Sequence, residues 1–376
     1  MSQCHHPTLN STTLNFQSEF TLNVLQKTGI NSSTIFSPIS ITFVLAMIYL
    51  GAKDQTAAQI RSTIAPGINE EEIHCHFSSI LSFIKENNVN GAGFPNDLKK
   101  DKKVVENGLI SIDWNVYNLF SLEFINQIYV QKNFTILESY KNNIKKYYNG
   151  NIENIDFVQS TAAVKKINDF VSKITKNKIN DLIPDFSPDT KLVIINSIYF
   201  EAEWEPIIED DDTYDTTFFS TEHKNRKIKM MKFKEDLEYF ENDDYQIVGI
   251  PYKNCQFSMF IILPRGKFAL EKVLKNFDAS NLSKTQTVNV WVHFPRFKIE
   301  SNFDVKNNLQ NLGITDAFNK NANFEGISEE EFLGVSEFQQ KAMIETNEFG
   351  TVAAAGSIAF IDHCLTESSE TVYRVV

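Results

Sequence analysis

The stretch ETNEFGTVAAAGSIAF, residues 345–360, decides how the whole chain is interpreted. It contains two glycines and several β-branched residues, and it carries no charge from Gly350 to Ile361, so a helix is disfavoured. In a strand, side chains alternate between two faces. One face would then carry only small residues, namely Thr351, Ala353, Ala355 and Ser357, and the other would carry Val352, Ala354, Gly356 and Ile358. The sequence therefore predicts a strand suited to tight burial, set between polar flanks.

Outside this stretch, helical patterns dominate the first half of the chain and strand patterns the second half. The expected helices are 14–27, 38–50, 56–64, 70–85, 137–148, 162–175 and 304–312. The expected strands are 34–36, 124–130, 191–200, 227–232, 245–250, 257–263, 287–294 and 333–344. Because helices and strands do not alternate regularly, the pattern predicts an α+β fold. We expect one domain, with N-terminal helices over 14–85 and an exposed insertion over 86–118.

Composition and charge exclude several classes of protein. The 376 residues carry a net charge of −12, which argues against a nucleic-acid partner. The longest apolar run, Ile41 to Ala52, is too short to span a membrane. No basic region followed by an apolar stretch opens the chain, and its four cysteines form no CxxC pair. We therefore expect free thiols and a cytoplasmic location, with unconventional export to the extracellular space left open.

The sequence contains no motif of a familiar enzyme. We find no G-x-S-x-G, no Walker loop and no H-E-x-x-H. The run His74-Cys75-His76 lies on an expected helix, where consecutive side chains fan apart and do not hold one metal ion together. We expect these three residues to form a helix surface with one half-buried cysteine. The prediction is a protein without metal or cofactor that is not an enzyme.

Several motifs, in order along the chain, resemble those of the serpin family. Residues 347–355, NEFGTVAAA, are similar to the inhibitory hinge of serpins, and FSPIS at 36–40 with AMIYLGA at 46–52 resembles their shutter strand and central helix. Residues 196–204, NSIYFEAEW, resemble the breach strand. The resemblance spans residues 14 to about 376. It implies a single serpin domain over 1–376, with the hinge and an exposed reactive-centre loop at 345–372.

The resemblance also implies a function and a set of site residues. Inhibitory serpins are suicide substrates, which trap a serine or cysteine protease as a covalent acyl complex when the cut loop inserts into the main sheet. The implied partner is a target endopeptidase, and the implied state is a monomer. The matching hinge residues are Glu348, Gly350, Thr351, Ala353, Ala354 and Ala355. The matching shutter and breach residues are Ser37, Ser40, Asn196, Trp204 and Gln340, with Gln340 where serpins usually have a histidine.

Two features at the C-terminal end complete these expectations. Counting from Gly350 by the family's spacing places the scissile bond at Cys364-Leu365, with Asp362, His363 and Leu365 as further candidates for the acyl-side residue. Serpins continue past the loop with two core strands, and this chain stops at Val376, so we expect those strands to be missing. The alternative function is accordingly that of a non-inhibitory or folding-impaired, truncated serpin that acts by binding alone.

Overall fold

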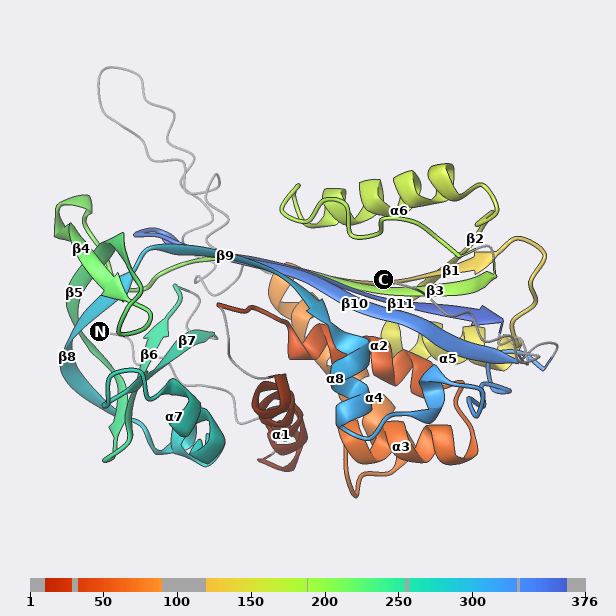
Figure 1. Ribbon diagram of the computed structural model, residues 1–376, viewed down its shortest axis with the longest axis horizontal. Helices are drawn as coiled ribbons and strands as arrows, with labels where there is room; N and C mark the ends of the chain where they lie inside the picture. Colours follow the sequence, from red (N-terminus) through yellow and green to blue (C-terminus); the bar gives the residue numbers. More distant parts are fainter. Residues whose placement is uncertain are drawn as a thin grey trace, which may run out of the picture.

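The computed structural model describes residues 11–28, 33–89, 120–187, 189–253, 257–329 and 332–363 (Figure 1). Its helices are α1 (Ser11–Thr28), α2 (Pro38–Tyr49), α3 (Asp54–Ile64), α4 (Glu70–Val89), α5 (Glu138–Tyr148), α6 (Ser160–Ile174), α7 (Leu270–Asn276) and α8 (Val305–Asn311). Three short 3-10 helices are η2 (Asp210–Asp212), η3 (Ala279–Lys284) and η4 (Asp316–Phe318).

The strands form two sheets. They are β1 (Phe120–Gln131), β2 (Asn151–Ile155), β3 (Thr190–Glu203), β4 (Thr213–Phe219), β5 (Asn225–Glu241), β6 (Tyr245–Pro251), β7 (Ser258–Pro264), β8 (Gln286–Pro295), β9 (Phe297–Asp304), β10 (Leu333–Thr346) and β11 (Gly350–His363). The larger sheet has six strands in the order β2-β1-β3-β11-β10-β9, and the smaller one has the order β4-β5-β6-β7 with β8 paired to β5. The α+β prediction is confirmed.

Helices cover both faces of the larger sheet. Figure 1 shows α6 on one face and α2, α3, α4 and α8 on the other. The helix closest to the sheet on that second face is α2, which is buried from Ser40 to Tyr49. Its start is fixed locally, because Pro38 occupies the first turn and the Ser37 hydroxyl caps the helix by accepting from the Ser40 amide at 3.4 Å. The main sheet is therefore buried on both sides over its central strands.

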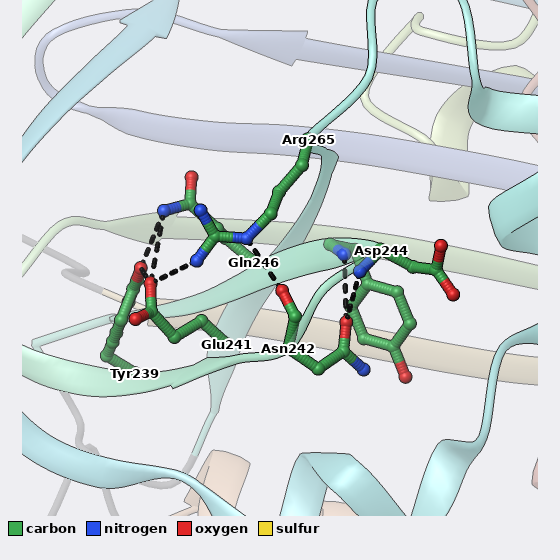
Figure 2. A network of polar contacts seen from close by, with 7 residues as sticks. Tyr239, Glu241, Asn242, Asp244, Gln246 and Arg265 are labelled. Atoms are coloured by element: carbon green, nitrogen blue, oxygen red, sulfur yellow. Dashed lines mark hydrogen bonds and ion pairs between the residues drawn. The ribbon is translucent and has the colours of Figure 1, made fainter.

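A polar network closes the hairpin between β5 and β6 in the smaller sheet (Figure 2). The Asn242 side chain accepts from the backbone amides of Asp244 and Tyr245 at 2.9 Å each. Arg265, just after β7, donates to the Asn242 carbonyl and to Glu241 at 2.6 Å each. Hydrogen bonds from neighbouring side chains and the charge of Arg265 hold the pKa of Glu241 below its ordinary value. The network thus links the ends of β5, β6 and β7 by hydrogen bonds.

The structure corrects several details of the predicted elements. The strand expected at 34–36 has no regular secondary structure, and β2, β4, β9 and α7 were not predicted. Helix α4 runs on to Val89, into the stretch predicted as an insertion, and the rest of that stretch lies outside the described residues. The expected exposed loop is also not seen in the described part of the chain, because Gly350–His363 forms the buried strand β11.

Candidate functional site: the inserted strand and its hinge

Strand β11 lies in the centre of the main sheet. It pairs antiparallel with β10 on one side and with β3 on the other, along nearly its whole length. From Gly350 to Ile361, every residue is buried except the half-buried Val352 and Ala353. The uncharged sequence explains this position, since a charged side chain at a central, covered strand would have to be paired or would cost several kcal/mol. The segment that was predicted as an exposed loop is thus a central strand of the main sheet.

The two faces of β11 pack against different layers. Ala354 and Ile358 pack into the cluster that includes Ile167 and Val171 of α6. On the opposite face, Ser357 points to the start of α2, where it joins side chains described below. The small face predicted from sequence is therefore buried, with Ala353 only in part, and the second face is covered as well by α6.

A tight connection joins β10 to β11 at the hinge. The Asn347 side chain accepts from the amides of Phe349 at 2.9 Å and Gly350 at 3.2 Å. Trp204, at the end of β3, donates from its indole to the Asn347 carbonyl at 2.8 Å and from its backbone amide to the Phe349 carbonyl at 2.9 Å. The Trp204 ring stacks on Tyr252 with centroids 4.7 Å apart. The predicted breach residue is thus a direct contact of the hinge.

Glu348 is a buried carboxylate at the tip of the hinge. It accepts a hydrogen bond from the Thr213 hydroxyl at 2.7 Å and forms an ion pair with Arg296. Burial alone would raise the pKa of Glu348, but the hydrogen bonds from Thr213 and the backbone, together with Arg296, outweigh burial and lower it. The carboxylate is therefore ionised at neutral pH and ties the hinge to the smaller sheet.

Gly350 is required at its position by a close approach of backbone. A Cβ atom added there would lie 2.0 Å from the Ala202 carbonyl oxygen and 2.8 Å from the Glu203 Cα. The next residue, Thr351, is buried and accepts a hydrogen bond from the Tyr252 hydroxyl at 2.9 Å. The first two residues of β11 therefore fit β3 only as glycine followed by a small polar side chain.

The predicted shutter residues meet in one buried cluster beneath the middle of β11. Gln340 accepts from the Ser37 amide at 2.7 Å and donates to the Ser37 carbonyl at 3.1 Å. The same amide group donates to the Ser357 hydroxyl at 2.6 Å, so that Gln340 connects the helix start to the inserted strand. The neutral Gln340 amide thus donates and accepts at the same time.

A second chain of hydrogen bonds extends from this cluster. The Ser40 hydroxyl donates to the Asn196 side chain, which in turn donates to Asn126 at 2.9 Å. Asn126 donates to the Tyr148 carbonyl at 2.9 Å. Asn126 was not identified from the sequence. The available signal was that Asn126 and Gln127 interrupt the apolar run of the predicted strand 124–130. Tyr252, Thr213 and Arg296 were also missed as hinge contacts, since nothing in their own local sequence points to the hinge.

The far end of β11 contains two of the candidates for the acyl-side residue. Asp362 lies opposite Gly334 and Thr190, and His363 donates its amide to the Asp189 carbonyl at 3.2 Å. Burial raises the pKa of Asp362, and the charges of Asp189 and Glu337 raise it further, while Ser336 and Thr190 partly oppose the rise. Cys364 and Leu365 lie outside the described residues, so the predicted scissile bond stays a prediction.

The predicted environment of the 74–76 run was wrong in its detail. Cys75 is exposed, whereas His74 is buried and its Nδ1 lies 2.5 Å from the Tyr148 hydroxyl. Burial lowers the pKa of His74 to about 4. Helix α4 directs this imidazole toward Tyr148 of α5, so His74 lies beside the buried core and not on the helix surface.

Comparison with known proteins identifies the family. A family model described as serpin (serine protease inhibitor) matches residues 15–374. The chain is a serpin. Serpin B10 of Sorex araneus is 31% identical to this serpin over 360 residues, which cover 90% of this chain and 86% of that protein. The leukocyte elastase inhibitor of Xenopus laevis is 29% identical over 368 residues, which cover 93% and 90% of the two chains.

Solved structures agree with this membership. This serpin is similar to a structure titled "Cleaved Serpin 42Da", with a TM-score of 0.81 and 25% identity, over 94% of this chain and 90% of the other. Emu ovalbumin is similar at the same TM-score and identity, over 96% and 92% of the two chains. Within the described ranges, no helix is long and apolar enough to cross a membrane, and no cluster of three metal-ligating side chains occurs.

Proposed function

We propose that this serpin inhibits endopeptidases as a suicide substrate. In this mechanism, the protease nucleophile attacks the scissile bond in the exposed loop and forms an acyl-enzyme, and the freed segment then inserts between β3 and β10. The protease, still covalently attached, is carried along and its active site is distorted. The residues that we assign to the hinge are Glu348, Gly350, Thr351, Ala353, Ala354 and Ala355.

One observation supports this proposal above all others: the uncharged segment Gly350–Ile361 pairs as a central strand with β3 and β10, and its register with β3 is continuous from Gly350 to Ile361. A strand that gains neighbours on both sides adds on the order of ten or more backbone hydrogen bonds, each worth about 0.5–1.5 kcal/mol net. That sum is comparable to the whole stability of a typical domain. Insertion therefore supplies enough free energy to drive the displacement of an attached protease.

The residues around the assigned bond favour a particular class of protease. With Cys364 on the acyl side, and with Leu365 or His363 as neighbouring candidates, no basic side chain is present for a trypsin-like pocket. We propose a serine or cysteine endopeptidase with an apolar pocket as the target, whereas Asp362 on the acyl side would suit an aspartate-specific one. We further propose one domain that acts as a monomer, and the cytoplasmic location stays a prediction.

A second candidate function is that of a serpin that only binds. The Asp362 side chain favours this candidate, because its Oδ1 is buried and has no hydrogen-bond partner. Burial raises the pKa of this carboxyl more than Ser336 and Thr190 lower it, so Asp362 at the far end of β11 opposes complete insertion. A chain that inserted slowly would be cut and released as a substrate, without trapping the protease.

The experiment that separates these candidates is a protease panel read on denaturing gels. Incubation with chymotrypsin, subtilisin and a cathepsin should give a covalent complex that survives SDS, and Thr351→Arg should abolish it. The arginine would bring a charge into the buried site beside Tyr252, which blocks insertion at its first step. Thr351→Ser, which keeps the hydroxyl, is the matched control and should still form complex. Complex formation by Thr351→Arg would refute the proposed mechanism.

A further inference from the structure

The outer face of the smaller sheet carries an exposed aromatic and basic surface that the trapping mechanism leaves unused. We call it the β4–β5–β8 outer face. It consists of Tyr214, Phe218, Arg226, Lys232, Lys234, Trp291 and His293. Their neighbours in sequence, Met231, Phe233 and Val292, point the opposite way into a buried cluster. Strand alternation thus separates an apolar inner face from this solvent-facing one.

Aromatic and cationic side chains contact one another along the whole surface. The Lys232 ammonium lies 4.5 Å and the Lys234 ammonium 5.8 Å from the centre of the Trp291 ring. His293 accepts or donates a hydrogen bond with the Tyr214 hydroxyl at 2.8 Å. Trp291 is nevertheless 58% exposed and Tyr214 41% exposed. A tryptophan left this exposed among other large apolar groups is typical of an interaction surface.

The charge of this surface contrasts with that of the whole chain. The chain carries a net charge of −12, yet residues 223–234 contain six lysines and arginines and no aspartate or glutamate, and three of the six, Arg226, Lys232 and Lys234, lie on the outer face. On the outer face itself Asp236, two residues beyond Lys234 in β5, accepts a hydrogen bond from Asn289 at 2.7 Å. The surface therefore complements an acidic partner. Its aromatic rings favour an acidic protein segment, whose side chains can pack on them, over a uniform polyanion.

The position of this face relates it to the hinge. Thr213, the first residue of β4, and Arg296, just after β8, both bind Glu348 at the hinge tip. The Arg296 amide also donates to the Lys229 carbonyl of β5 at 2.9 Å. Before insertion the loop leaves the main sheet at this hinge, so a protease that attacks the loop would stand over this end of the molecule.

We propose that the β4–β5–β8 outer face is a second docking surface, which binds an acidic segment of the protease that attacks the loop. This inference rests on the proposed inhibitory function for the identity of its partner. Complementary charges would accelerate the encounter, and Trp291 would supply the buried apolar contact at the centre of the interface. The serpin would then recognise its target protease by an acidic surface segment as well as by the pocket that binds the acyl-side residue.

The first test is direct binding and needs no protease. The probe is a fluorescein-labelled peptide of six glutamates around one tyrosine, compared by anisotropy with a heparin oligosaccharide and an oligothymidylate of equal charge. We expect K232E/K234E to weaken peptide binding about ten-fold and W291A about five-fold. The matched double reversal K85E/K320E, at two exposed lysines outside the face, should change it less than two-fold. Unchanged binding by the face variants, or tighter binding of heparin or oligothymidylate, would overturn the inference.

The second test measures the rate at which a trapped protease forms its covalent complex. K232E/K234E should slow this rate about ten-fold at low salt and little at 0.5 M salt, because screening removes the steering. Unchanged rates with every protease that the wild type traps would refute the docking surface and leave the inhibitory function intact. If no protease is trapped, the inhibitory function fails, and peptide binding still decides whether the face recognises acidic segments. Equal melting temperatures of the variants establish that they fold.

Discussion

Replacing Gly350 by alanine should weaken the first pairs of the inserted strand while leaving the uncut protein unchanged. The added Cβ would lie 2.0 Å from the Ala202 carbonyl oxygen and 2.8 Å from the Glu203 Cα, and because these are backbone atoms of β3, no flexible side chain can move aside. Before insertion this residue does not pair with β3 under the proposed mechanism, so the methyl group has room. The substitution therefore acts on the inserted state alone.

The magnitude follows from the hydrogen bonds at this end of β11. Restoring an ordinary contact requires the strands to separate by about 1.4 Å, which breaks roughly three backbone hydrogen bonds near Gly350 and Trp204, or about 1.5–4.5 kcal/mol. At about 2.1 cal/mol/K per residue, a chain of 376 residues has an unfolding entropy of about 0.8 kcal/mol/K. The melting temperature of the loop-cleaved form should therefore fall by about 2–6 °C.

Differential scanning calorimetry of uncut and loop-cleaved protein measures this effect, with catalytic chymotrypsin as the cleaving protease. Gly356→Ala is the matched control, because its added Cβ would meet side-chain atoms and no backbone, with Leu182 at 3.1 Å and Val171 at 3.6 Å. This control should keep the cleaved form within about 1 °C of the wild type. Equal melting of cleaved Gly350→Ala and cleaved wild type would refute the reasoning, as would an equal loss in both alanine variants.

Three further predictions concern polar groups around β11. Gln340→Ala should lower the melting temperature of the cleaved form through a loss of about 1–3 kcal/mol, because the Ser37 amide and the Ser357 hydroxyl lose their partner. Glu348 has a lowered pKa, so its stabilising contribution is present above the unfolded-state pKa of about 4.3 and is lost as the pH falls. Glu348→Gln should thus flatten the acid limb of a melting-temperature profile below pH 5, and an unchanged limb would contradict this assignment. Asp362 has a raised pKa, so ionisation destabilises the inserted strand as the pH rises above about 3.9. Asp362→Asn should therefore raise the melting temperature of the cleaved form at pH 7, and a lower one would show that the carboxylate stabilises it.

Much of the main sheet was accessible from sequence because its central strands are rich in apolar and β-branched residues, with polar residues interspersed in β10. Residues 191–200 and 333–344 were predicted as strands, and the structure extends them by a few residues to β3 and β10. The small face of 350–358 was also predicted correctly, since strand alternation depends on nothing beyond the residues themselves. By contrast, β9 was missed because it alternates exposed and half-buried residues at the edge of the sheet.

The parts of the site that escaped prediction are those made by contacts between distant segments. Glu348 was identified, but its partners Thr213 and Arg296 lie 135 and 52 residues away in sequence, and no local pattern links them. Asn126 and Tyr148 complete the hydrogen-bond chain below Asn196 from two other elements. His74 was predicted at the helix surface because the sequence around it is polar. It is buried because α4 packs on α5, a tertiary contact that the local sequence does not indicate.

Helix α6 lies across the very part of the sheet that receives the new strand. Val171 on this helix and Leu182 in the segment after it cover Gly356 so closely that a Cβ atom there would lie 3.6 Å and 3.1 Å from their side chains. Under the proposed mechanism, α6 and the segment after it have to move away from the sheet while β11 inserts, and then pack on the sheet again. An attacking enzyme escapes if water hydrolyses the acyl bond before that happens. The stability of α6 on the sheet thus determines how fast the strand inserts relative to hydrolysis of the acyl-enzyme. Under the same mechanism, a ligand that stabilises α6 in place would slow insertion, and the protease would cleave the protein as an ordinary substrate.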